Sequence, residues 1–166
     1  EARAARPGAQ ARHDGRTDAA PTGSTMLDAT YRMPYLAHAT MEPMNCTAHV
    51  RADGVEVWAP TQLQTAVQMT GAAIGGVPLE KVVVHTTYMG GGFGRRVEQD
   101  FVVEALEASK AMKAPVKVIW SREDDMQHDF YRAASHHQFR GGLDAAGKPV
   151  FWTHRVETTS SMLRCF

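Results

Sequence analysis

A run of glycines between a β-branched segment and a helix-like segment is the strongest constraint on how this chain folds. Residues 86–100 read TTYMGGGFGRRVEQD, so four of the five positions 90–94 are glycine and the fifth is Phe93. Each glycine costs about 0.5–1 kcal/mol of backbone entropy relative to alanine, and four exceed what a tight turn needs. The backbone here is therefore expected to approach another group closely. A strand, a glycine loop and a helix N-terminus in succession are typical of an anion site.

The two common phosphate-loop patterns do not fit this stretch. G-x-x-x-x-G-K-[ST] fails because Arg95 and Arg96 stand where Gly-Lys-Ser/Thr would be required. G-x-G-x-x-G fails because Gly90 and Gly92 are followed by Arg95 at the third glycine position. Two alternatives stay open beside a cofactor loop. One is a phosphate-binding module of another kind, and the other is a turn that only packs a helix against a sheet.

The rest of the chain alternates strand-like and helix-like segments. This order predicts an α+β fold with a mixed sheet and two main helices. Thr61 and Gln64 have the spacing of a capping box at the start of the first helix. The second helix is expected to bury one face, and residues 121–135 are expected to form a polar loop. The expected strands are 25–33, the two sides of an Asp53-Gly54 turn, 79–89, a buried strand at 115–120, and a hairpin around 144–147.

The second helix, the chain ends and the cysteines give further expectations. The apolar face of that helix is expected to comprise Phe101, Ala105, Ala108 and Met112, with Val102 and Leu106 beside them. Residues 1–25 lack apolar periodicity and are expected to form a disordered leader. Residues 26–166 are expected to form one partial domain that is interrupted at its C-terminal end. Cys46 and Cys165 are too few and too far apart for a disulfide framework or a zinc site, and Cys46 is expected to be a buried thiol.

Charge and hydropathy exclude some classes of function. The chain carries 18 basic and 18 acidic residues, and this balance argues against a nucleic-acid partner bound through bulk electrostatics. No apolar run approaches the roughly 20 residues of a membrane span, and the first residues lack the apolar core of a secretory signal. Localisation is not indicated by the sequence.

Three motifs in a fixed order resemble a known enzyme family. They are HATMEPMNCTA, WAPTQ and MGGGFGRRVEQDFVVEA, and the resemblance extends over about residues 26–158. The sequence is similar to the molybdenum-binding large subunit of the xanthine dehydrogenase/aldehyde oxidase family, most of all to the isoquinoline 1-oxidoreductase beta subunit type. The resemblance implies that this chain forms the first part of the large molybdopterin-binding region.

The same resemblance implies roles for individual residues. Gly91, Gly92, Phe93 and Gly94 would lie against the molybdenum centre, with backbone N–H groups facing its oxygen and dithiolene ligands and the Phe93 ring walling an apolar substrate pocket. Gln62 would donate a hydrogen bond to an oxygen ligand of the metal. These five residues are the predicted cofactor-binding set, with no direct metal ligand among them.

The residues after the loop depart from xanthine dehydrogenase itself. Where that enzyme continues with a lysine and a pocket glutamate, this chain has Arg95, Arg96 and Val97. The resemblance therefore favours an aldehyde or a nitrogen heterocycle over a purine. The two arginines would either bind a cofactor phosphate or a partner carboxylate, or pair within the chain with Glu98 and Asp100.

Other titratable residues point to structural roles. His38 and Glu42 are four residues apart, but Pro34 and Pro43 disfavour the helix that a metal pair would need, so packing and hydrogen bonding are expected for them. His136 and His137 are neighbours in a predicted strand, so their side chains would face opposite sides of the sheet and would not share a metal.

The resemblance also implies what lies outside this chain. The glutamate base of the family has no counterpart here, so no catalytic residue is assigned. The cofactor would be molybdopterin, in its cytosine dinucleotide form, and the [2Fe-2S] clusters would reside on a small partner subunit. The isolated chain is expected to be inactive. A stand-alone or remnant domain that binds no metal stays an alternative.

Overall fold

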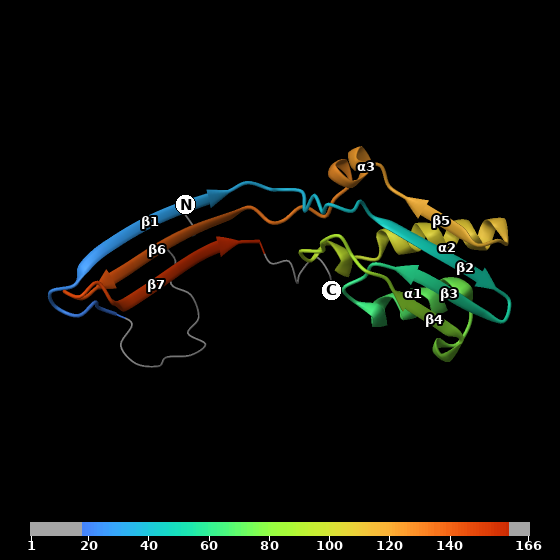
Figure 1. The fold of residues 1–166 in the computed structure, drawn as a ribbon, viewed down its shortest axis with the longest axis horizontal. Helices are drawn as coiled ribbons and strands as arrows, with labels where there is room; N and C mark the ends of the chain where they lie inside the picture. The colour runs from blue at the N-terminus through green and yellow to red at the C-terminus, as the bar shows by residue number, and fades with distance from the viewer. Residues whose placement is uncertain (1–17, 160–166) are drawn as a thin grey trace. The chain divides into compact units, whose positions relative to one another are not determined.

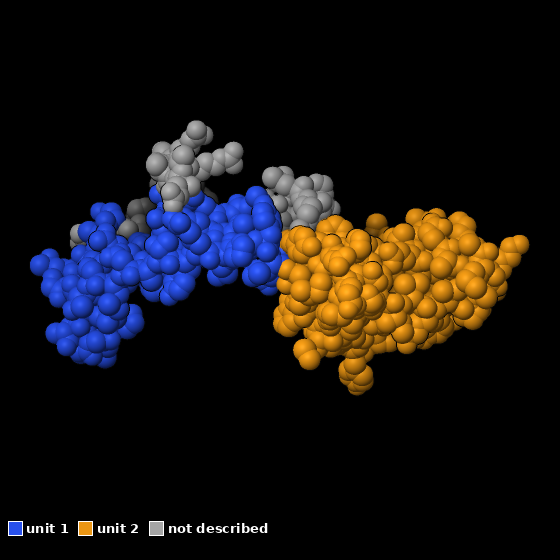
Figure 2. Space-filling model, turned by 90° about the horizontal axis from the view of Figure 1, so that it is seen from above, with its two compact units in different colours: residues 1–36, 132–166 blue, residues 37–131 orange. Residues whose placement is uncertain are grey.

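The computed structural model describes residues 18–159, so most of the predicted leader and Cys165 lie outside the described residues. The chain divides into two compact units, which Figure 2 shows in different colours. Unit 1 combines residues 1–36 with 132–166, and unit 2 spans Ala37–Tyr131. None of the helices within residues 18–159 has the length and apolar composition of a membrane span.

Unit 2 is built on a four-stranded mixed sheet in the order β4-β3-β2-β5 (Figure 1). The central hairpin pairs β2 (Asn45–Arg51) with β3 (Gly54–Ala59) around the predicted Asp53-Gly54 turn. β4 (Val82–Thr86) pairs parallel with β3, and β5 (Val116–Ile119) pairs antiparallel with β2. The α+β expectation with two main helices is confirmed, and the strands within residues 18–159 form two sheets.

Two helices bury one face of this sheet. α1 (Gln64–Gly75) packs on β3 and β4, and α2 (Asp100–Met112) packs on β2 and β5. Alternate residues of the hairpin strands point at the helices, and every fully buried apolar side chain of the described residues belongs to unit 2. The core consists of Met44, Cys46, Ala48, Val55, Val57, Ala59, Val67, Val82, Phe101, Val102, Ala105 and Leu106.

The starts of two helices differ from the sequence-based expectation. The predicted capping box at α1 is absent, because the Thr61 hydroxyl accepts the Leu63 N–H at 3.0 Å and donates to the Arg96 carbonyl at 3.2 Å. The polar loop predicted for 121–135 was wrong at its start, where α3 (Arg122–Gln127) forms. The Ser121 side chain and Asp124 make a reciprocal capping box there, and this S-x-x-D pattern was visible in the sequence.

Three further expectations need correction. β5 is an edge strand and not a buried one, since Ile119 is 63% exposed. The strand predicted for 79–89 is shorter, because a 3₁₀ turn, η1 (Leu79–Lys81), precedes β4. Phe101, Ala105, Val102 and Leu106 do face the core, but Met112 at the end of α2 is exposed and Ala108 is only partly buried.

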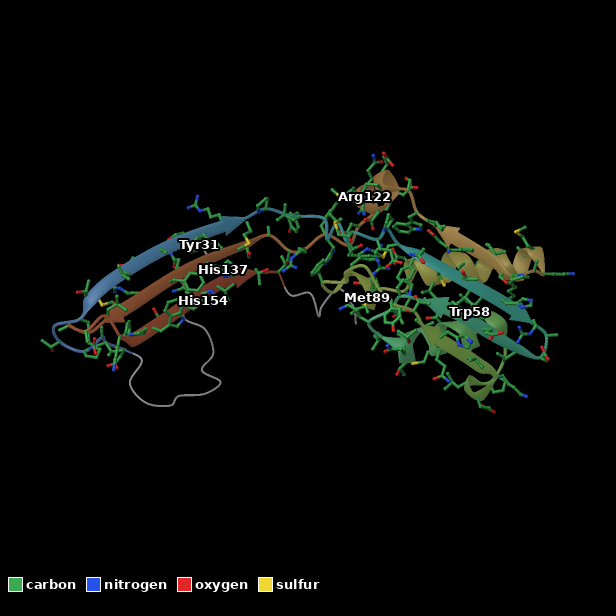
Figure 3. All side chains as sticks on the ribbon, viewed as in Figure 1. Tyr31, Trp58, Met89, Arg122, His137 and His154 are labelled. Atoms are coloured by element: carbon green, nitrogen blue, oxygen red, sulfur yellow. The ribbon has the colours of Figure 1, made fainter. Side chains whose placement is uncertain are left out.

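Unit 1 is a three-stranded antiparallel sheet in the order β1-β6-β7. β1 (Thr25–Met33), β6 (Ser135–Leu143) and β7 (Pro149–Thr158) confirm the predicted strand and C-terminal hairpin. Aromatic side chains share one face, where a hollow of about 430 Å³ is lined by Leu27, Tyr31, Phe139 and Trp152, among others. Figure 3 labels Tyr31, His137 and His154 on the three strands.

Candidate functional site

The glycine loop, residues 90–94, follows β4 and leads through a 3₁₀ turn, η2 (Arg95–Val97), into α2. Gly91, Phe93 and Gly94 have φ values of +100°, +55° and +96°. A positive φ is uncommon for a phenylalanine, so the surrounding contacts must hold Phe93 in this conformation. Its ring is 65% exposed, which leaves an apolar surface beside the loop.

Two of the glycines are required by contacts with the chain itself. A Cβ on Gly90 would lie 2.6 Å from the Glu42 Cβ, and one on Gly92 would lie 2.6 Å from the Gln62 Oε1. Gly91 and Gly94 are instead favoured by their positive φ. The sequence favoured a bound group as the reason for the glycines and left a packing turn as an alternative; side chains of this unit already explain two of the glycines.

Gln62 is placed against the loop by two hydrogen bonds. Its Oε1 accepts the N–H of Gly94 at 3.0 Å and the N–H of Arg96 at 3.3 Å. Because the oxygen is held by two donors, the orientation of the amide follows from the network. The Nε2 group of Gln62 has no hydrogen-bond partner among residues 18–159, so a donor remains at the edge of the loop.

The carbonyl groups of the loop are hydrogen-bonded within the chain, whereas three of its N–H groups are not. The carbonyls of Gly90, Gly91 and Gly92 accept hydrogen bonds from the Glu42 N–H at 3.2 Å, the Arg96 Nε at 2.7 Å and the Arg95 N–H at 2.9 Å. The N–H groups of Gly91, Gly92 and Phe93 have no such partner in the described part of the chain. Gly92 is buried, and an unpaired buried N–H is rare in proteins, so water or a bound acceptor is expected there.

Arg95 is fully buried and paired within the chain. It donates to both carboxylate oxygens of Asp100, at 2.9 and 2.6 Å, and its Nε lies 2.8 Å from Asp129 Oδ1. Its guanidinium also lies 5.4 and 5.3 Å from the ring centroids of Trp120 and Phe130. Burial alone would lower the pKa of Arg95, but Asp100 first and Asp129 next raise it. Of the alternatives for this arginine, pairing with Asp100 is the one observed.

Arg96 is equally buried, but its charge is paired with one carboxylate, where that of Arg95 is paired with two. Its Nη2 donates to the Glu42 carbonyl at 2.7 Å and to Glu42 Oε2 at 3.0 Å, and its Nη1 has no hydrogen-bond partner in the described residues. Burial lowers the pKa of Arg96, and the charge of Glu42 offsets this only in part. The sequence offered Glu98 and Asp100 as in-chain partners for the two arginines, and the ion pair observed for Arg96 is with Glu42.

The other candidate residues take structural positions. The His38 Nδ1 lies 2.9 Å from Asp129 Oδ2, so His38 and Glu42 serve separate contacts, as expected. The His137 Nδ1 and His154 Nε2 lie 2.9 Å apart on the exposed sheet of unit 1, and the described residues contain no group of three or more metal-ligating side chains. Burial raises the pKa of the Cys46 thiol to about 12, in line with an inert buried cysteine.

Sequence reasoning did not find that Glu42 binds the loop or that Asp129 binds His38 and Arg95. Glu42 lies 48 residues before Gly90, and Asp129 lies 91 residues after His38, so no local pattern links them to the loop or to each other. The clue available was the MEP motif itself, which contains an acid without a neighbouring base.

The chain is similar to known proteins over most of its length. The molybdopterin cofactor-binding domain family matches residues 3–161. The chain is 36% identical over 136 residues to the membrane-bound aldehyde dehydrogenase [pyrroloquinoline-quinone] of Gluconacetobacter polyoxogenes, covering 81% of this chain and 18% of that protein. It is 42% identical over 97 residues to the isoquinoline 1-oxidoreductase subunit beta of Brevundimonas diminuta, covering 58% of this chain and 12% of that protein.

A solved structure has the same fold. Reconstituted CO dehydrogenase from Oligotropha carboxidovorans superimposes with a TM-score of 0.60 at 21% identity, over 81% of this chain and 17% of that chain. The chain thus spans less than a fifth of the length of these relatives. The match over nearly the whole chain and the three motifs agree, and the protein belongs to the molybdopterin cofactor-binding domain family of xanthine dehydrogenase- and aldehyde oxidase-type large subunits.

Proposed function

We propose that this chain provides one wall of the molybdopterin site in a molybdenum hydroxylase, with Gln62 and residues 91–94 facing the cofactor. The observation that carries the proposal is the row of N–H groups on Gly91, Gly92 and Phe93 that have no partner in the described chain. Donors of this kind suit the oxygen and sulfur acceptors of molybdopterin and of a metal bound to it. The residues present therefore fit the group that the family binds.

Gln62 adds a neutral donor to this wall. Its Oε1 is occupied by the N–H groups of Gly94 and Arg96, so its Nε2 is the atom available to an acceptor in the site. An amide donor binds an oxygen without adding a charge of its own. Gln62 would therefore orient the bound group without changing its net charge.

The exposed ring of Phe93 indicates which class of substrate the site would accept. Its exposed ring lies beside the N–H groups and offers an apolar surface suited to an aromatic or aldehyde substrate. Arg95 and Arg96 are paired with acids of this chain and their side chains are buried, so neither guanidinium is exposed to a substrate carboxylate. We infer an aldehyde or nitrogen heterocycle as substrate. The bound cofactor would supply the oxidation, with water as the source of oxygen.

The partners follow from the same proposal. The cofactor would be the cytosine dinucleotide form of molybdopterin. A separate small subunit would carry the [2Fe-2S] clusters that accept electrons, since two cysteines cannot hold one cluster. The base that takes the proton from water would lie elsewhere in the large subunit. This chain alone would then bind and orient, and it would not turn over substrate.

The test is molybdenum content. A large subunit carrying these residues would be produced with its small subunit, and molybdenum would be measured by elemental analysis, with released cytidine monophosphate reporting the dinucleotide form. Gly92→Val should lower molybdenum at least about tenfold, because its side chain displaces the Gln62 amide and covers the N–H groups. The control Glu104→Ala alters only a surface acid bonded to Trp120 and should load normally.

Other outcomes distinguish the alternatives. Full molybdenum content in Gly92→Val would show that the loop is structural only. Substrate-dependent dye reduction by the 166-residue chain alone would contradict the assignment of the base to another part of the subunit. Saturable binding of free nucleotides by the chain would instead support a phosphate-binding module.

A further inference from the structure

Glu42 makes close contacts with the first glycine of the loop. Its backbone N–H donates to the Gly90 carbonyl at 3.2 Å, and its Oε2 accepts the Gly90 N–H at 2.9 Å. The two residues are so close that a Cβ on Gly90 would lie 2.6 Å from the Glu42 Cβ. Position 90 is therefore a glycine because Glu42 occupies the space of a side chain.

Glu42 is itself held on several sides. Its Oε1 accepts the Asn45 side chain at 2.9 Å, and its carbonyl accepts the Thr40 hydroxyl at 2.6 Å. Arg96 Nη2 donates to the Glu42 carbonyl at 2.7 Å and to its Oε2 at 3.0 Å. An acid with this many partners has one preferred rotamer and acts as a fixed support for the loop.

Arg96 reaches the next peptide unit. Its Nε donates to the Gly91 carbonyl at 2.7 Å, while its Nη2 remains on Glu42. The planar guanidinium thus joins the loop backbone to the Glu42 support with a fixed geometry that a lysine would not reproduce. Its side chain is buried, so water does not compete for these bonds.

Peptide planarity turns these carbonyl contacts into an orientation of N–H groups. In a trans peptide the carbonyl and the following N–H point in opposite directions, and the described chain has no cis bonds. Glu42 fixes the carbonyl of Gly90, and Arg96 fixes that of Gly91. The N–H groups of Gly91 and Gly92 must then point away from the Glu42–Arg96 pair, and these are two of the unpartnered donors.

We propose that Glu42 and Arg96 are positioning residues, which aim the N–H groups of the glycine loop at the bound group by holding the carbonyls behind them. The inference rests on the proposed function for what the donors bind. The orientation itself belongs to this chain and needs no cofactor. Such preorganised donors lose little freedom when an acceptor arrives.

The test is the backbone order of the loop in the ligand-free chain. ¹⁵N relaxation would be measured for the amides of residues 90–94 in the wild type and in Arg96→Lys, which keeps the charge but loses the two-sided contact. Rigid backbone gives order parameters of about 0.85 and flexible backbone below about 0.6. We expect the loop to move from the first range toward the second, while the amides of β2 and β3 stay unchanged.

The matched control is Arg122→Lys. Arg122 also donates to two backbone carbonyls, those of Thr40 and Met41, but it has no hydrogen bond to the glycine loop. The Arg122→Lys variant should therefore keep the backbone order parameters of residues 90–94 at their wild-type values. Figure 3 labels Arg122 and also Met89, which directly precedes the loop.

Several results would overturn the proposal. Wild-type order of the loop in Arg96→Lys would show that the carbonyl contacts do not hold it. A uniform loss of order across unit 2 would show that Arg96 only stabilises the fold. If Arg96→Lys does not fold, Glu42→Gln serves instead, because it keeps the size of the side chain and removes the charge; it should mobilise the same residues less.

The two proposals fail separately. A loop that is ordered by Glu42 and Arg96, in a subunit that loads no molybdenum, would refute the proposed cofactor and leave the contacts standing. A mobile loop in the wild-type chain, in a subunit that loads molybdenum normally, would refute the positioning role alone.

Discussion

The glycine loop and the turn between β6 and β7 both contain glycines at positive φ, yet they are held differently. In the turn, Asp144 Oδ1 accepts the N–H groups of Ala146 at 2.8 Å and Lys148 at 2.9 Å, and a Cβ on Gly147 would meet nothing within 4 Å. The glycine loop instead depends on Glu42 and Gln62, which lie 48 and 32 residues from the groups they bind.

The β6–β7 turn is a local turn, which neighbouring residues determine, whereas the glycine loop is an assembled turn, which residues far apart in the sequence hold together. The turn of unit 1 is determined by residues within four positions of each other, so it can form as soon as the strands pair. The glycine loop reaches its conformation only when β2, α1 and α2 are in place. Its donors are therefore a property of the folded unit 2, and changes in that unit should reach the loop while changes in the hairpin stay local.

The largest effect expected is the difference in reactivity of the core thiol between the folded and the unfolded chain. Cys46 lies in the closed core of unit 2, and burial raises its pKa to about 12 from 9.0, so its thiolate is on the order of a thousandfold rarer at pH 8 than that of an exposed thiol. In a Cys165→Ser background, iodoacetamide labelling should be slower by about that factor than in the urea-unfolded chain. Equal rates would show that the core opens readily.

The same thiol gives a pH dependence with a definite sign. Because the folded pKa is raised, the folded chain keeps its proton where the unfolded chain has lost it. The contribution of Cys46 to stability is fully present below pH 9 and is lost as pH rises toward about 12. The matched comparison is Cys46→Ala, whose urea midpoint should fall less steeply above pH 9.

Ion pairs give the next largest contrast. Arg95 and Asp129 have side chains that are 0% and 1% exposed, whereas Arg140 and Asp28 in unit 1 are 59% and 64% exposed. Asp129→Ala should cost about 3 kcal/mol, because Arg95 loses one of two carboxylates in a buried place. Asp28→Ala should change the free energy of unfolding by less than about 1 kcal/mol. Urea denaturation measures both, and similar losses would remove the distinction between the two regions.

Glycine substitutions compare the two loops directly. Gly90→Ala needs no strained φ but places a Cβ 2.6 Å from that of Glu42, so it should cost about 2 kcal/mol and shift the amide resonances of residues 91–96. Gly147→Ala meets no atoms but must adopt φ +79°, which costs about 1 kcal/mol. Its resonance shifts should stay within residues 144–148. Shifts that spread into the strands would show that this turn is not local.

The sequence predicts the local features of this protein and misses the contacts between distant segments. Hydrophobic alternation and turn residues are sufficient for β2, β3 and the β6–β7 hairpin, because neighbouring residues decide these structures. The motif order also predicts that residues 91–94 face a cofactor. The partner of Arg96 could not be predicted, since Glu42 lies 54 residues away in the sequence and no local pattern links the two. The capping box predicted at Thr61 fails for the same reason, because the Thr61 hydroxyl donates to the carbonyl of Arg96, 35 residues away. The capping box at Ser121 is local and could have been predicted from its S-x-x-D pattern.

The smallest effect expected is that of Asp144→Ala in the hairpin turn. The variant removes one acceptor that serves two N–H groups, and both donors are exposed and can bind water instead. The loss should therefore be about 1 kcal/mol or less, near the net value of an ordinary hydrogen bond. Gln62→Ala is its counterpart in the glycine loop, because Gln62 Oε1 also serves two N–H groups. If the loop is an assembled structure, Gln62→Ala should disturb the order of residues 92–96, whereas Asp144→Ala leaves β6 and β7 paired as before. Equal and purely local effects would mean that the amide contacts of the glycine loop are as dispensable as those of an ordinary turn.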